Sequence, residues 1–178
     1  MSVRIIYFVH GTTTDNERGL STGWNPGELS ELGMRQAKQL GALVADKTFD
    51  AFFCSDLKRA VDSAQLGFAS KYTITLDKRL RESNYGDLNG TPEKHVHYNE
   101  HIETPFPNGE SMHDVEKRMR AFLDDLKKNY AGRRVAILAH KAPQLALEVI
   151  TNNKTWKQAL SEDWRNTKSW QPGWKYQI

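Results

Sequence analysis

Short apolar runs rich in β-branched and aromatic residues alternate along this chain with segments of helical spacing. Strands are predicted at Val3–Val9, Asp50–Cys54, Thr73–Leu76 and Arg134–Ala139. Helices are predicted over residues 31–46, 57–70 and 143–150, with another opening at Ser111. This alternation is typical of an α/β fold. We expect a single-domain three-layer sandwich over residues 1–178, with a mainly parallel sheet and helices on both faces.

Several residues indicate where the helices begin. Ser30 and Ser111 are typical N-cap residues, and Asp114 follows Ser111 at the spacing of a capping-box variant. Pro143 is expected as the first residue of its helix, where a missing N–H costs nothing. Residues 77–110 have no steady period, and so long a loop in a compact domain is usually functional or disordered. We interpret it as an excursion around the active site.

Charge and cysteine content exclude several partners and compartments. The formal charge of +3 and the pI near 8.9 are mild, and no dense basic stripe of the kind that binds nucleic acid is visible. Val3–Val9 is too short to span a membrane or to act as a signal peptide, and the single Cys54 cannot form an internal disulfide. We expect a cytoplasmic protein that binds neither nucleic acid nor membranes, and whose pocket suits a small phosphorylated ligand.

Four polar residues are expected at the same edge of the sheet. His10 and His140 each follow the end of a predicted strand, Arg59 lies early in the helix after a third strand, and Glu82 lies in the long loop. The carboxyl ends of parallel strands meet at one edge, where ligands bind. Two imidazoles, a guanidinium and a carboxyl suit phosphoryl transfer, in which catalysis is mostly positioning and charge stabilisation.

Six short motifs carry a resemblance to a known family. In chain order they are His10-Gly11 with Thr13 and Asn16; Gly23 with residues 28–33 and Gln36-Ala37; residues 55–60; residues 80–82 with Tyr85-Gly86 and Gly90; residues 109–111 with Arg118; and residues 138–140. Over nearly the whole chain this pattern resembles the histidine phosphatase superfamily, also called the phosphoglycerate mutase-like family.

The resemblance implies a role for each candidate residue. His10 would attack phosphorus to form a phosphohistidine, and Glu82 would protonate the leaving oxygen. Arg59 and His140 would bind the nonbridging oxygens. The rest of the phosphate cradle would come from Gly11, Asn16, Ser21 and Gly23. Neither a metal nor a cofactor is implied.

Two positions depart from the family pattern. Val9 stands where the family has arginine, and a lost charge-assisted hydrogen bond is worth about 1.5–3 kcal/mol, or roughly 10- to 100-fold in rate. Lys141 stands where the family usually has glycine. Two interpretations stay open: Lys141 returns positive charge to the pocket, or it extends into solvent while Val9 merely completes its strand.

Three functions therefore compete. The leading one is hydrolysis of a small phosphomonoester. The second, motivated by Val9, is a module that binds a phosphorylated ligand but turns it over poorly. The third is a phosphoglycerate-type mutase, which residues 85–90 resemble, although the chain is shorter than that branch and lacks its inserted segments.

Two other features have simpler explanations. Cys54 and Arg59 are separated by four residues, whereas a cysteine phosphatase needs five, so Cys54 is interpreted as a small core residue. Trp156, Leu160 and Trp164 share one predicted helical face. We expect this face to pack onto the domain, and the alternatives are a homodimer surface or a lid over the pocket.

Overall fold

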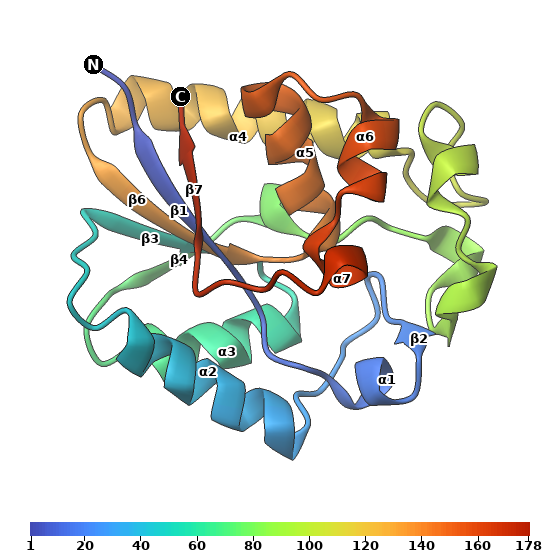
Figure 1. Cartoon of the computed structure of the whole chain (residues 1–178), viewed down its shortest axis with the longest axis horizontal. Helices are drawn as coiled ribbons and strands as arrows, with labels where there is room; N and C mark the ends of the chain where they lie inside the picture. Colours follow the sequence, from blue (N-terminus) through green and yellow to red (C-terminus); the bar gives the residue numbers. More distant parts are fainter.

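A computed structural model describes the whole chain, residues 1–178, and is built around one five-stranded sheet (Figure 1). The strands are β1 (Arg4–Val9), β3 (Ala51–Cys54), β4 (Ile74–Leu76), β6 (Arg134–Ala139) and β7 (Trp174–Gln177), in the spatial order β4-β3-β6-β1-β7. The first four are parallel, and β7 pairs antiparallel with β1 at one edge. The expected α/β class and mainly parallel sheet are confirmed.

Helices cover both faces of this sheet, and each face buries its own apolar cluster. One layer holds α2 (Glu31–Leu43) and α3 (Lys58–Phe68); the other holds α4 (Met112–Asn129), α5 (Lys141–Asn152) and α6 (Trp156–Ser161) (Figure 1). Side chains of a strand point alternately to opposite faces, so Tyr7 and Phe8, adjacent in β1, belong to different clusters. Cys54 is fully buried in the α2/α3 cluster, which confirms its assignment to the core.

The predicted helix starts are confirmed at two positions and wrong at one. Ser30 Oγ accepts the Gly33 N–H at 3.2 Å, and Ser111 forms a capping box with Asp114. However, α5 begins at Lys141, so Pro143 is its third residue rather than its first. The whole first turn of a helix lacks intrahelical partners for its N–H groups, so proline is tolerated there as well.

The C-terminal region does not form the single helix that was expected to carry Trp156, Leu160 and Trp164 on one face. It forms α6, then a separate short helix α7 (Trp164–Thr167), and then the strand β7, which was not predicted. Asp163 caps α7 and so interrupts the helical spacing. Trp156 and Leu160 are nevertheless buried, and Trp164 packs against the same cluster, which confirms the expected packing onto the domain.

Residues 77–110 contain little regular structure, as expected for a long loop. They contain 3₁₀ turns at 78–80, 86–88, 93–95 and 98–101, together with strand β5 (Thr91–Pro92). Strand β5 pairs with β2 (Leu20–Ser21), which follows the short helix α1 (Thr14–Glu17). This pairing brings the loop after β1 beside the 77–110 segment, and together they frame one end of the sheet. No helix of the chain is both long and apolar enough to cross a membrane.

Candidate active site

One cavity of about 270 Å³ lies at the carboxyl edge of the parallel strands. His10 directly follows β1, and His140 directly follows the neighbouring strand β6. Of the predicted site residues, the cavity is lined by His10, Asn16, Ser21, Gly23, Arg59, Glu82 and Lys141. The fold therefore brings together residues that are more than 100 positions apart in the sequence.

His10 is held as a neutral imidazole with one ring nitrogen free. Its Nδ1 lies 2.7 Å from the Gly11 carbonyl, which can only accept a hydrogen bond, so Nδ1 carries the proton. Burial, followed by the charge of Arg59, lowers the pKa of His10 from its ordinary 6.5 to about 3. At neutral pH Nε2 therefore keeps its lone pair, as a nucleophile requires.

His140 lies behind His10 and is fully buried, with 5.0 Å between the two ring centroids. Its backbone N–H donates to the Tyr7 hydroxyl, which in turn donates to the His140 carbonyl. Its Nε2 lies 2.8 Å from Ser55 Oγ. The Ser55 hydroxyl already accepts the Leu57 N–H and has no other acceptor for its own proton, so we assign Ser55 as the donor to His140 Nε2. His140 Nδ1 then carries the proton, and it is buried without a partner in the chain. A ligand oxygen would satisfy it.

Arg59 is the buried cation of the cavity, with 2% of its surface exposed. Two backbone carbonyls orient it, since its Nη2 donates to Gly23 at 2.8 Å and its Nη1 to Asn25 at 3.4 Å. Gly23 has a φ of +54°, and a Cβ there would lie 1.8 Å from Asn89 Oδ1. Glycine is therefore required at the turn that fixes the guanidinium.

The Glu82 carboxylate is fixed by three backbone N–H groups. Ser83 and Ala142 donate to Oε1, both at 2.9 Å, and Lys141 donates to Oε2 at 3.2 Å. Two of these donors belong to the first turn of α5, which has no side-chain cap of its own. Glu82 therefore caps α5 from a distant loop, and this contact places its carboxyl beside His140, the residue preceding that helix.

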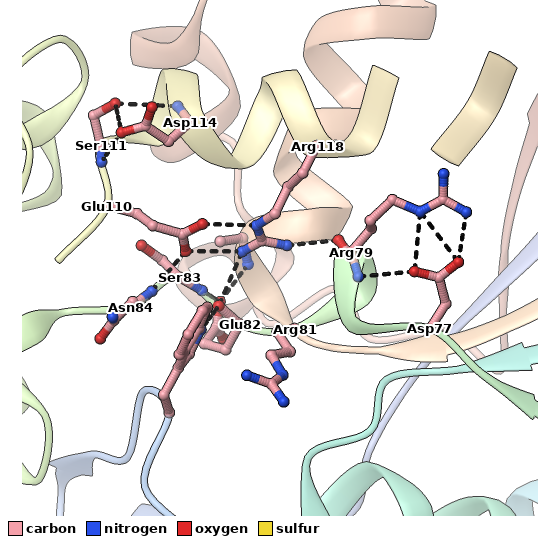
Figure 2. A network of polar contacts seen from close by, with 12 residues as sticks. Asp77, Arg79, Arg81, Glu82, Ser83, Asn84, Glu110, Ser111, Asp114 and Arg118 are labelled. Carbon is pink, nitrogen blue, oxygen red and sulfur yellow. Dashed lines mark hydrogen bonds and ion pairs between the residues drawn. The ribbon is translucent and has the colours of Figure 1, made fainter. Parts of the chain in front are cut away.

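A second network holds the backbone of the Glu82 loop (Figure 2). Arg118 on α4 donates to the Arg79 carbonyl at 2.6 Å and to the Glu82 carbonyl at 3.0 Å. The same guanidinium pairs with Glu110 at 2.9 Å, and Glu110 accepts the Asn84 N–H at 2.9 Å. Arg118 and Glu110 thus connect the loop to α4 and keep Glu82 in place.

The four predicted cradle residues differ in what they can offer a ligand. Gly11 was expected in the cradle but does not line this cavity: its N–H donates to Ser63 Oγ, and its carbonyl orients His10. The Asn16 Oδ1 atom is used in the capping box of α1, which leaves only its amide nitrogen for a ligand. Ser21 and Gly23 line the cavity wall on either side of Thr22.

Lys141 does not extend into solvent, which excludes one of the two interpretations. Its side chain is 16% exposed and lines the cavity, with Nζ 3.5 Å from Asp163 Oδ2 and 3.8 Å from Glu93 Oε1. Other lining residues were not predicted, among them Glu93, Tyr98 and Arg165, whereas Trp164 belongs to the face for which a lid over the pocket was one alternative. No pattern in the sequence indicated Arg165, although it directly follows Trp164 in the chain.

The lowered pKa of His10 gives a pH prediction. His10 is neutral in the folded protein down to about pH 3, whereas in the unfolded chain it takes up a proton below 6.5. We therefore expect the free energy of unfolding to fall as pH drops below 6.5, by about 2 kcal/mol at pH 5 from His10 alone. Urea unfolding at pH 7.5 and pH 5 measures this change. His10→Gln should make it smaller, and an equal pH dependence in both proteins would contradict the assignment.

Comparisons with known proteins give a consistent match. The family model described as histidine phosphatase superfamily (branch 1) matches residues 6–170. A 2,3-bisphosphoglycerate-dependent phosphoglycerate mutase of Sinorhizobium fredii is 32% identical over 180 residues, covering 90% of this chain and 85% of that protein. The corresponding mutase of Rhizobium meliloti is 33% identical over 179 residues, covering 90% and 84%. A solved mycobacterial glucosyl-3-phosphoglycerate phosphatase superposes with a TM-score of 0.77 at 26% identity, covering 90% and 84%.

Proposed function

The chain belongs to the histidine phosphatase superfamily, and from that premise we propose that it hydrolyses small phosphomonoesters through a phosphohistidine at His10. The observation that carries the proposal is the hydrogen bond from His10 Nδ1 to the Gly11 carbonyl. It leaves Nε2 unprotonated beside Arg59 and Glu82 in one cavity. The small volume of that cavity, about 270 Å³, favours a compact substrate over a macromolecule.

The proposed reaction has two steps, and every bond and proton is accounted for in them. In the first, the lone pair of His10 Nε2 forms a bond to phosphorus, the bond to the ester oxygen breaks, and Glu82 gives that oxygen a proton. In the second, water attacks phosphorus, the Glu82 carboxylate takes the water proton, and the N–P bond breaks. Inorganic phosphate leaves, and both residues return to their starting states.

The negative charge of the phosphoryl oxygens is stabilised by N–H donors that are positioned before the substrate binds. Arg59 offers the guanidinium N–H groups not used by the Gly23 and Asn25 carbonyls. His140 offers Nδ1–H, a buried donor whose missing partner would be supplied by a phosphoryl oxygen. Because these donors are held by surrounding hydrogen bonds, they need little rearrangement as charge develops in the transition state.

Glu82 as general acid leads to a prediction about leaving groups. Glu82→Gln should reduce kcat on alkyl phosphates roughly 100-fold or more, and much less on p-nitrophenyl phosphate, whose phenolate leaves without a proton. Steady-state rates on both substrates test this. Glu93→Gln is the matched control, because Glu93 also lines the cavity but is 57% exposed, and it should show no leaving-group dependence. Equal losses on the two substrates in Glu82→Gln would remove Glu82 from the role.

A mutase is the second candidate, and the curated relatives favour it. The chain covers 84–85% of the length of those two mutases, so its short length is a weaker argument against this function than expected. Incubation with 3-phosphoglycerate and 2,3-bisphosphoglycerate, followed by ³¹P NMR, separates the two activities. Accumulation of inorganic phosphate supports the hydrolase, and accumulation of 2-phosphoglycerate supports the mutase. Phosphate binding without turnover of any phosphomonoester would support the binding module.

A further inference from the structure

The cavity contains a cation that the family pattern does not supply. Val9, which has no charge, lines the cavity beside His10 at the position where an arginine was expected. Arg165, on the short helix α7, lines the same cavity. We propose that Arg165 supplies the phosphoryl-binding charge that Val9 lacks, an assignment that rests on the proposed phosphoryl chemistry at His10.

Asp163 determines where the Arg165 guanidinium lies. Its Oδ1 accepts the backbone N–H of Arg165 at 3.1 Å and the Nη1 of the same residue at 2.9 Å. Asp163 is 3% exposed, so this is a buried anchor. A carboxylate that binds Nη1 leaves the other guanidinium N–H groups available for a ligand. Arg165 is thus held at one atom and can donate from the others.

Helix α7 is itself fixed to the core beside the cavity. Trp164 Nε1 donates to Gln144 Oε1 on α5 at 3.1 Å, and the Trp164 ring lies 5.5 Å from that of Trp174 on β7. The Arg165 guanidinium lies over the Trp164 ring, 4.4 Å from its centroid. Figure 1 shows α7 near the end of β1, where the chain continues into α1. These contacts restrict the guanidinium before any ligand binds, as a preorganised anion site requires.

Lys141, the residue that the sequence suggested for this role, lines the same cavity, but its ammonium is paired with two carboxylates. Its ammonium lies between Asp163 and Glu93 and 4.1 Å from the centroid of the Tyr98 ring. The pKa shifts agree that Arg165 acts on the two histidines and Lys141 on Tyr98. Burial and the charge of Arg59 lower the pKa of both His10 and His140, and the charge of Arg165 lowers both further. The charge of Lys141 instead lowers the pKa of Tyr98, against the larger effect of burial.

A double-mutant cycle tests the proposal with p-nitrophenyl phosphate as substrate and inorganic phosphate as the binding probe. Arg165→Gln should lower kcat/KM by roughly 10- to 100-fold and raise the Kd for phosphate, since one charge-assisted contact is lost. Arg165→Lys should keep part of both. Val9→Arg should restore activity to Arg165→Gln while changing the wild type by less than about 3-fold, because both residues would supply the same charge.

Controls separate charge from folding. Lys168→Gln removes a positive charge at the end of the same helix, outside the cavity, and should leave kcat/KM within about 2-fold of wild type. Thermal unfolding identifies variants that lose structure. If Val9→Arg does not fold, the comparison of Arg165→Gln with Arg165→Lys decides: a greater loss in Arg165→Gln supports the charge role, and equal losses overturn it.

Three results would overturn the proposal. They are activity and phosphate affinity of Arg165→Gln close to wild type, independent effects of the Val9 and Arg165 changes, and a loss in Lys141→Ala that exceeds the loss in Arg165→Gln. Failure of the proposed function is distinguishable from these. If the wild type hydrolyses no substrate, the phosphate Kd alone decides: weaker binding by Arg165→Gln supports the charge role, and unchanged binding contradicts it.

Discussion

Replacing His10 with alanine is expected to lower phosphatase activity by roughly 1,000-fold or more, because the covalent step loses its nucleophile. The wild type, quenched during turnover of a radiolabelled phosphomonoester, should carry a phosphoenzyme that is stable in base and labile in acid, as expected for an N–P bond. His10→Ala should carry none.

His113→Ala is a matched control for that experiment. His113 lies on α4, is exposed, and contacts Glu103 rather than the cavity. It should form the phosphoenzyme at the wild-type level. Activity that survives in His10→Ala, or an adduct of acid-stable character, would contradict the proposed intermediate.

Loss of the Arg118 side chain is expected to have the largest effect on stability. Arg118→Met should lower the free energy of unfolding by about 3 kcal/mol, because it leaves Glu110 without its cation and the Arg79 carbonyl without its donor, and it removes one of the two donors to the Glu82 carbonyl. We also expect kcat to fall roughly 10-fold, since the Glu82 carbonyl keeps only its hydrogen bond from Trp24 and the loop loses its connection through Arg118 to α4. Urea unfolding and steady-state kinetics measure the two effects.

Arg120→Met provides the control on the same helix. Arg120 also pairs with a glutamate, Glu116, at 2.6 Å, but its side chain is 54% exposed whereas that of Arg118 is 15% exposed. Exposed pairs contribute little, so we expect a loss below about 1 kcal/mol and unchanged kinetics. Similar losses in the two variants would mean that the Arg118 contacts do not hold the Glu82 loop.

Local patterns were sufficient to predict most of the core architecture. The strands at Val3–Val9 and Arg134–Ala139 are long apolar runs, and the caps at Ser30 and Ser111 depend on a few neighbouring residues. The edge strand β7 was missed because a four-residue alternation is too short to distinguish from a loop. Its strand character comes from pairing with β1, a contact distant in sequence.

The candidate site also has a part that the sequence predicted and a part that only the fold supplies. Family motifs indicated His10, Arg59, Glu82 and His140, and the fold places these four at one end of the sheet, with His140 buried behind the cavity that the others line. The motifs could not indicate how Glu82 is held, because its donors belong to α5 and its loop is held by α4.

The sequence by itself determined the alternation of strands and helices and the positions of the residues that follow the strand ends, because these depend on neighbours a few positions away. It also determined that Val9 brings no charge to the nucleophile. Only the tertiary structure decided that Arg165 lies in the same cavity, 156 positions further along the chain. That placement results from the packing of Trp164 on α5 and β7 and from the buried carboxylate of Asp163, contacts that no local pattern encodes.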